Sequence, residues 1–139
     1  MEPIRLESEA ATVAYAQKLA KEIKPGQTIA LTGELGAGKS FLARASMRAL
    51  GVTDEALPSP TFALIQTYDG RDCQVAHMDW YRLDDAVEIE MLGVRDYFEP
   101  PWITIIEWPE RAPSILPSDA IRIELTTDPA DFKVRYLIR

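Results

Sequence analysis

Hydrophobic and polar positions alternate along the 139-residue chain in blocks that predict helices and strands in turn. Apolar residues recur at helical spacing between Ser8, a candidate N-cap, and Pro25, which predicts a helix there. The short apolar run 28–31 predicts a buried strand. Helical spacing returns from Lys39 to Gly51, so the first third of the chain has the order helix, strand, helix.

The rest of the chain continues this alternation. Strand-like segments are expected at 57–68, 71–81 and 102–108, a helix at 84–92, and a final alternating strand pair at 121–125 and 133–138. No repeat, low-complexity tract or long linker divides the chain. We therefore expect a single α/β domain over residues 1–139, with a mostly parallel central sheet flanked by helices and a C-terminal strand pair.

Composition narrows the class of protein. The hydrophobic fraction of 47% is that of an ordinary globular domain, and no apolar run is long enough to cross a bilayer. Cys73 is the only cysteine and His77 the only histidine, which excludes an internal disulfide and a cysteine-based zinc cluster. With no recognisable signal peptide, the chain is expected in the cytoplasm. A net charge of −7 disfavours direct binding to a polyanion such as nucleic acid, although it could equally serve solubility.

One segment carries a complete phosphate-binding motif. Residues 33–40, "GELGAGKS", match G-x-x-x-x-G-K-[ST], with a predicted strand before and a predicted helix after. Glycines allow backbone N–H groups to surround phosphate oxygens, and a helix N-terminus favours an anion. Lys39 is expected to reach the β- and γ-phosphates, and the Ser40 hydroxyl to bind Mg²⁺. The nucleotide-binding residues predicted here are Glu34, Leu35, Gly36, Ala37, Gly38, Lys39, Ser40 and Phe41.

Two carboxylates follow predicted core strands. Asp79 ends the run "QVAHM" and Glu107 ends "WITII". Ligands of open α/β sheets lie beyond the carboxyl ends of the strands, so both acids are candidates for a magnesium site with catalytic roles. A helix cap or a surface ion pair is the alternative for each. His77 lies on the same strand face as Asp79 and is interpreted as a hydrogen-bonded structural residue, while Trp108 is expected at the rim of the site.

The segment "SPTF" (59–62) lies between the phosphate-loop helix and the Asp79 strand. In P-loop proteins a threonine here can sense the γ-phosphate through Mg²⁺, which makes Thr61 a candidate switch residue. A proline turn that opens a strand explains the same residues equally well.

Taken together in this order, "GELGAGKS", "SPTF", "HMDWYRL" and "IEWPER" resemble the TsaE (YjeE) family, and "DYFE" (96–99) is also similar to it. The resemblance covers nearly the whole chain. It implies a small bacterial P-loop ATPase that binds ATP and Mg²⁺, hydrolyses ATP weakly alone, and acts in threonylcarbamoyladenosine modification of tRNA next to the anticodon. It further implies docking onto a dimer of the TsaB and TsaD proteins, with TsaD performing the transfer and the ATP cycle resetting the complex.

The resemblance also implies roles for residues. Ser40 and Glu107 would coordinate magnesium, Thr61 would be the switch threonine and Asp79 the Walker B-like acid. The nucleotide would also be approached by Trp108, by the region from Ser8 to Thr12, and by Arg135. The chain departs from the family at Ser40, where threonine is common, and at Ala63, where a polar residue is frequent.

Two other functions remain open at this stage. A small-molecule kinase would usually carry an arginine-rich lid, but only about thirty residues follow Trp108. A nucleotide-gated binding module, in which ATP occupancy orders "SPTF" and hydrolysis is incidental, overlaps with the ATPase hypothesis. We expect an isolated chain to be monomeric and tRNA to be reached only through the partner complex.

Overall fold

A computed structural model describes residues 2–60 and 64–139. The candidate switch residue Thr61 lies outside the described residues, as does Ala63. The described strands form one seven-stranded sheet in the order β1-β7-β6-β2-β5-β4-β3. Their bounds are β1 Ile4–Leu6, β2 Thr28–Thr32, β3 Ile65–Asp69, β4 Gln74–Asp79, β5 Trp102–Glu107, β6 Ile121–Thr127 and β7 Arg135–Ile138.

The expected α/β class is confirmed, and the expectation of a mostly parallel sheet is confirmed only in part. Strands β6, β2, β5 and β4 are parallel neighbours, whereas β3 pairs with β4, β6 with β7 and β7 with β1 in antiparallel fashion. The connection between β3 and β4 is the short turn 70–73, which cannot hold the crossover that parallel strands require. The predicted C-terminal strand pair is present as β6 and β7. The short edge strand β1 was not predicted.

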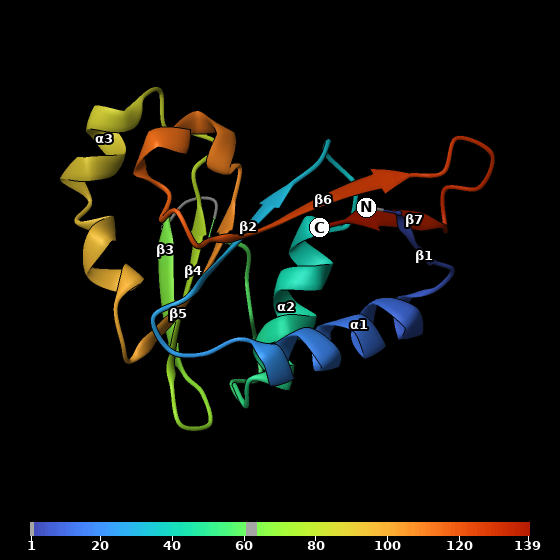
Figure 1. Cartoon of the computed structure of the whole chain (residues 1–139), viewed down its shortest axis with the longest axis horizontal. Coiled ribbons are helices and arrows are strands. Elements are labelled where there is room, and N and C mark those ends of the chain that lie inside the picture. The colour runs from blue at the N-terminus through green and yellow to red at the C-terminus, as the bar shows by residue number, and fades with distance from the viewer. Residues whose placement is uncertain (1, 61–63) are drawn as a thin grey trace.

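The helices cover both faces of the sheet. They are α1 Glu9–Glu22, α2 Lys39–Ala49 and α3 Ala86–Met91, with short 3-10 helices η1 Val94–Phe98, η2 Pro109–Arg111 and η3 Pro113–Ile115. Helices α1 and α2 lie together against one face, and α3 lies with η1 and η3 on the opposite side (Figure 1). Ser8 caps α1 as predicted, because its Oγ accepts a hydrogen bond from the amide of Ala11 at 3.1 Å.

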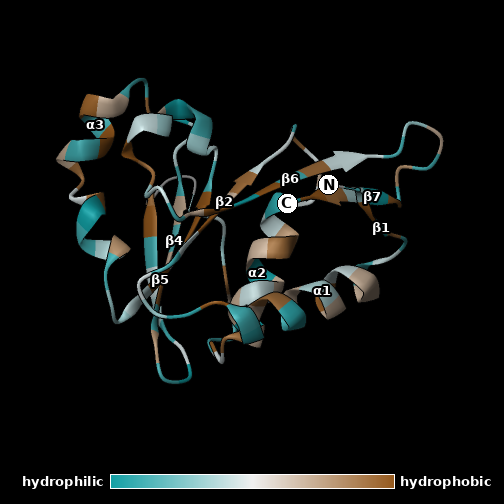
Figure 2. Ribbon diagram, in the orientation of Figure 1, coloured by the Kyte–Doolittle hydropathy of each residue, from teal (hydrophilic) through white to brown (hydrophobic). Residues whose placement is uncertain are grey.

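Alternate residues of the central strands build two separate cores. Ile29 and Ile105 pack with α1 and α2, whereas Ala30 and Ile106 face α3 and the 3-10 helices. Figure 2 shows hydrophobic residues concentrated on the central strands, while the turn joining β3 to β4 is hydrophilic. Because both faces of β2 and β5 are buried, the sequence of these strands reads as continuous apolar runs.

No helix in the described part of the chain is long and apolar enough to cross a membrane.

Candidate functional site

The predicted phosphate-binding segment connects β2 to α2. Gly33 has a φ of 147°, and a Cβ atom there would lie 2.5 Å from the carbonyl oxygen of Leu125 in β6. Gly38, which precedes the first turn of α2, has a φ of 100°. Larger residues would therefore displace the loop from β6 or strain its backbone. The loop is held so that the free amides of the first turn of α2 face the place where an anion would bind.

The two strand-end carboxylates lie side by side, as expected. Asp79 at the end of β4 pairs in register with Glu107 at the end of β5, and Glu107 pairs with Leu31 in β2, just before the phosphate loop. The Ser40 hydroxyl donates a hydrogen bond to Oε1 of Glu107 over 2.9 Å. The Asp79 Oδ1 atom accepts one from the amide of Tyr81. The parallel arrangement thus brings residues from three strand ends to one point.

Glu107 is also bound from the opposite side by His77. The Nε2 atom of His77 lies 2.6 Å from Oε2 of Glu107, and both side chains are buried, with relative exposures of 0% and 3%. The other ring nitrogen of His77, Nδ1, has no hydrogen-bond partner. Burial alone is the largest influence on Glu107 and acts to raise its pKa. The combined hydrogen bonds and charges of His77, Ser40 and Lys39 outweigh it, so the pKa of Glu107 is lowered and the carboxylate form is favoured.

Lys39 is buried between the loop and Trp108. Its Nζ donates a hydrogen bond to the carbonyl oxygen of Gly33 and lies 3.4 Å from the centre of the Trp108 ring. Burial lowers the pKa of Lys39, although the negative charges of Glu110, Glu107 and Asp79 act in the opposite direction. The ammonium thus lies between a carbonyl oxygen of the loop and the face of the Trp108 ring, with three carboxylates nearby.

Trp108 itself adopts a left-handed backbone conformation, with a φ of 61°. Its ring lies 4.8 Å from that of Tyr81, and the guanidinium of Arg111 lies 5.4 Å from the Tyr81 ring. Left-handed backbone in a bulky residue is uncommon and is often found at functional sites. The expected position of Trp108 at the rim of the site agrees with this geometry.

Two cavities flank the phosphate loop. The strand-end cavity, of about 530 Å³, is lined by residues that include Lys39, Ser40, Asp79, Glu107 and Trp108. The hairpin cavity, of about 600 Å³, lies between the start of α1, the start of α2 and the β6–β7 hairpin. Gly38 and Phe41 line both cavities, so one extended ligand could occupy the two together.

The hairpin cavity contains the remaining predicted residues. Ser8, Thr12 and Arg135 all line it. The guanidinium of Arg135 donates hydrogen bonds to the carbonyl oxygens of Ala37, at 3.0 Å, and Gly36, at 3.2 Å. Arg135 thus contacts the phosphate loop itself, a contact that the sequence did not predict, because a pairing between residues almost one hundred positions apart leaves no local pattern.

The remaining phosphate-loop residues are divided between the two cavities. Ala37 lines the hairpin cavity, while Leu35 and Gly36 line the strand-end cavity. Glu34 lies at the turn of the loop, where its carbonyl accepts a hydrogen bond from the amide of Ala37. The His77–Glu107 pair was missed as well. Its only sequence signal is the two-residue spacing from His77 to Asp79, which places both on one strand face.

The donor set suits a magnesium ion. Ser40 and Glu107 supply a hydroxyl and a carboxylate oxygen 2.9 Å apart, and Mg²⁺ prefers oxygen ligands. The described residues contain no group of three or more His, Cys, Asp or Glu side chains able to hold a metal ion by themselves. Few protein ligands, completed by water and phosphate oxygens, are what Mg²⁺ uses in nucleotide sites.

Comparison with known proteins identifies a single family. Residues 6–135 match the family described as "Threonylcarbamoyl adenosine biosynthesis protein TsaE". Similar proteins named "tRNA threonylcarbamoyladenosine biosynthesis protein TsaE" occur in Haemophilus influenzae (39% identity over 68% of this chain and 60% of that protein), Synechocystis sp. (40%, 76% and 68%) and Bacillus subtilis (36%, 81% and 69%). The match to the Haemophilus protein thus spans less than two thirds of its length.

A solved structure is also similar over almost the whole chain. The crystal structure of YdiB from Bacillus subtilis has a TM-score of 0.80 at 26% sequence identity, and the similarity covers 98% of this chain and 82% of that one. The similarity in fold therefore extends over the same part of the chain as the match to the family.

Proposed function

Because the chain belongs to the TsaE family of threonylcarbamoyl adenosine biosynthesis proteins, we propose that it is a magnesium-dependent P-loop ATPase in tRNA threonylcarbamoyladenosine biosynthesis. The observation that supports this most directly is the hydrogen bond between Ser40 in the phosphate loop and Glu107 at the end of β5. This pair supports the proposal because a hydroxyl and a carboxylate, both ligand types that Mg²⁺ accepts, lie together at the start of the helix that follows the phosphate loop.

In this proposal ATP extends across both cavities. Its phosphates lie against the loop and the first turn of α2, and its nucleoside lies in the hairpin cavity near Ser8 and Thr12. Ser40 and Glu107 would hold Mg²⁺, and Asp79, which lines the same cavity, would contribute as the Walker B-like acid. When bound, the ion neutralises charge on the β- and γ-phosphates.

The chain's own residues position the phosphates and the attacking water. Lys39 leaves the Gly33 carbonyl and pairs with phosphate oxygens, which are stronger acceptors because they are charged. His77 holds one oxygen of Glu107, so the other oxygen stays directed at Ser40. Asp79 or Glu107 orients the attacking water, and Thr61 is the proposed switch residue. Catalysis of this kind rests on position and charge rather than on a covalent intermediate.

We further propose that turnover depends on partners. Arg44 and Arg82 line the strand-end cavity, and Arg111 lies over the ring of Tyr81. An arginine finger adds positive charge in the transition state of phosphoryl transfer, and in this proposal a TsaB–TsaD complex supplies or orders that charge. The chain would act as a monomeric single domain in the cytoplasm and reach tRNA through that complex.

The test measures ATP hydrolysis and modified adenosine for the chain alone and with the TsaB and TsaD proteins and tRNA. Hydrolysis is expected to be slow alone and to rise at least about tenfold with partners, a change in barrier of about 1.4 kcal/mol. Lys39→Ala is expected to weaken ATP binding by about 10- to 100-fold, since hydrogen bonds to charged groups contribute about 1.5–3 kcal/mol.

The matched control is Lys21→Ala, a lysine in the last turn of α1, which should change neither quantity. Fast hydrolysis by the isolated chain would contradict partner dependence. Unchanged ATP affinity in Lys39→Ala would refute the phosphate site.

A further inference from the structure

An exposed aromatic residue at the tip of the β6–β7 hairpin has no structural explanation within the fold. The side chain of Phe132 has a relative exposure of 74%, and within residues 2–60 and 64–139 it is the only exposed phenylalanine or tryptophan. Leaving such a side chain in water forfeits the free energy that burial would provide. Phe132 is also one of the residues that line the hairpin cavity. An exposed aromatic side chain at the edge of a cavity is suited to a ligand with a flat apolar surface.

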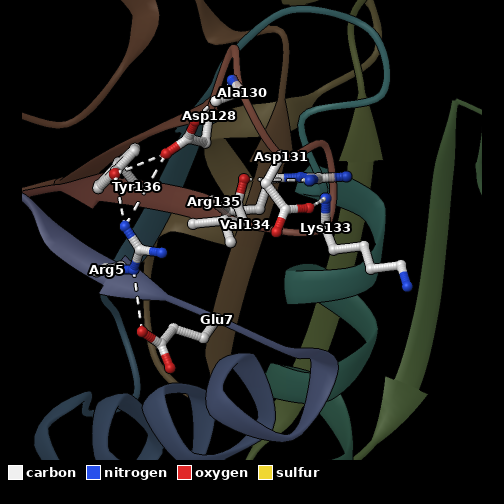
Figure 3. Close-up of polar contacts among 9 residues, drawn as sticks. All are labelled: Arg5, Glu7, Asp128, Ala130, Asp131, Lys133, Val134, Arg135 and Tyr136. Atoms are coloured by element: carbon white, nitrogen blue, oxygen red, sulfur yellow. Dashed lines mark hydrogen bonds and ion pairs between the residues drawn. The ribbon is translucent and has the colours of Figure 1, made fainter.

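The hairpin turn that carries Phe132 is held in one conformation by its own polar groups. The Oδ1 atom of Asp128 accepts a hydrogen bond from the amide of Ala130 at 2.7 Å, and Oδ1 of Asp131 accepts one from Lys133 at 3.0 Å. A backbone hydrogen bond from the amide of Asp128 to the carbonyl oxygen of Val134 closes the turn. Figure 3 shows these contacts at the base and tip of the hairpin. The backbone of the turn that carries Phe132 is thus held by contacts within the hairpin.

A second network fastens the hairpin to β1. The Tyr136 hydroxyl donates a hydrogen bond to Oδ2 of Asp128 at 2.8 Å, and Arg5 in turn donates one to the Tyr136 oxygen at 3.1 Å (Figure 3). Arg5 also lies 4.0 Å from the Asp128 carboxylate. Since β1 leads directly into α1, the same contacts fix the opposite wall of the hairpin cavity, which includes Ser8.

Arg135 connects this hairpin to the phosphate loop. Its Nη1 donates to the carbonyl oxygen of Phe132, while its Nε and Nη2 donate to those of Ala37 and Gly36. One planar guanidinium therefore holds the backbone of the residue that bears the exposed ring and the backbone of the loop at once. The separation between Phe132 and the phosphate site is fixed by a single side chain.

We propose that Phe132 stacks on the base of the bound nucleotide, and that Arg135 is a positioning residue that keeps this base platform at a set distance from the phosphate loop. The inference rests on the proposed nucleotide function and adds to it the residue that recognises the base. Base–aromatic stacking of this kind tolerates different bases, since each has a flat face. Phe132 therefore contributes affinity for a nucleoside over bare phosphate.

The experiment compares ATP with inorganic tripolyphosphate, which has the phosphates but no base, by calorimetric titration in the presence of Mg²⁺. Phe132→Ala is expected to weaken ATP binding about tenfold, equal to about 1.4 kcal/mol. Its tripolyphosphate affinity should stay within about twofold of the unmodified chain. Phe132→Tyr should restore ATP affinity, because the aromatic face is retained. Arg135→Ala should weaken both ligands, and Arg135→Lys should recover part of the loss.

The matched control is Met91→Ala, which removes another strongly exposed apolar side chain far from the cavity, on α3, and should change neither affinity. Equal loss of both ligands in Phe132→Ala, or loss of neither, would overturn the proposal. If the unmodified chain bound neither ATP nor tripolyphosphate, the proposed function itself would fail, and this outcome is distinct from a failure of Phe132 alone.

Discussion

At the residue scale, the site depends on a buried carboxylate whose two oxygens have separate partners. Glu107 is buried at the wall of the strand-end cavity, with Ser40 on one oxygen and His77 on the other. The residue types at 40 and 107 are predictable from the sequence, because each follows a recognisable strand or loop. The contact with His77 is not predictable, because it depends on the register between β4 and β5.

His77→Leu is expected to destabilise the chain by about 1–3 kcal/mol, because a buried carboxylate oxygen loses its hydrogen-bond partner. Adding Glu107→Gln to this variant should recover part of the loss, since a neutral amide is easier to bury than a charge. Chemical denaturation of the two single variants and the double variant measures the coupling. Additive single effects would show that His77 and Glu107 do not act as a pair.

At the element scale, the β6–β7 hairpin is the part of the fold whose role was least evident in the sequence. Its two strands were predicted from alternation alone, at 121–125 and 133–138, and both are present. The hairpin is, however, joined to β1 through Arg5 and to the phosphate loop through Arg135. These partners are far away in the chain, so no local pattern could indicate them.

The Asp128 carboxylate predicts how this hairpin responds to pH. Hydrogen bonds from the Ala130 amide and the Tyr136 hydroxyl are the main causes that lower the pKa of Asp128 below its ordinary value, and the nearby charge of Arg5 adds to them. A lowered folded-state pKa stabilises the fold above the ordinary value, and that contribution is lost as pH falls through the folded-state pKa.

Asp128→Asn is expected to lower Tm relative to the unmodified chain near neutral pH and to lose this difference in acid. The amide still accepts the Ala130 hydrogen bond but has no charge to lose, so only the unmodified chain should show the added loss below about pH 4. Thermal unfolding from about pH 7 to about pH 3 gives the comparison. A Tm difference that does not vary with pH would contradict this account.

At the scale of the whole molecule, two layers of helices on a mixed sheet place three strand ends beside one helix N-terminus. Parallel pairing of β2 with β5 and of β5 with β4 makes this convergence unavoidable, since parallel strands end on the same edge. The net charge of −7 is a separate property of the whole molecule. It disfavours direct binding to a polyanion and so agrees with the proposal that tRNA is reached through a partner.

A ligand that binds only this assembled edge should stabilise the entire fold. Mg²⁺ with ATP at about one hundred times its dissociation constant is expected to add about 2.7 kcal/mol to the free energy of unfolding and to raise Tm by several degrees. Lys39→Ala should show little of this shift at the same concentration. An equal rise in Tm for both proteins would mean that ATP binds elsewhere.

By itself, the sequence determined the phosphate loop, the two strand-end acids, the helices and strands around them, and the resemblance to one family. These follow from local periodicity and from motifs of adjacent residues. Only the tertiary structure decided that β3 pairs antiparallel with β4 and β1 with β7, that His77 binds Glu107, and that Arg135 joins Phe132 to the loop. Each of these depends on strand order and register, which arise from packing between distant segments and therefore leave no mark on the residues next to them in the chain.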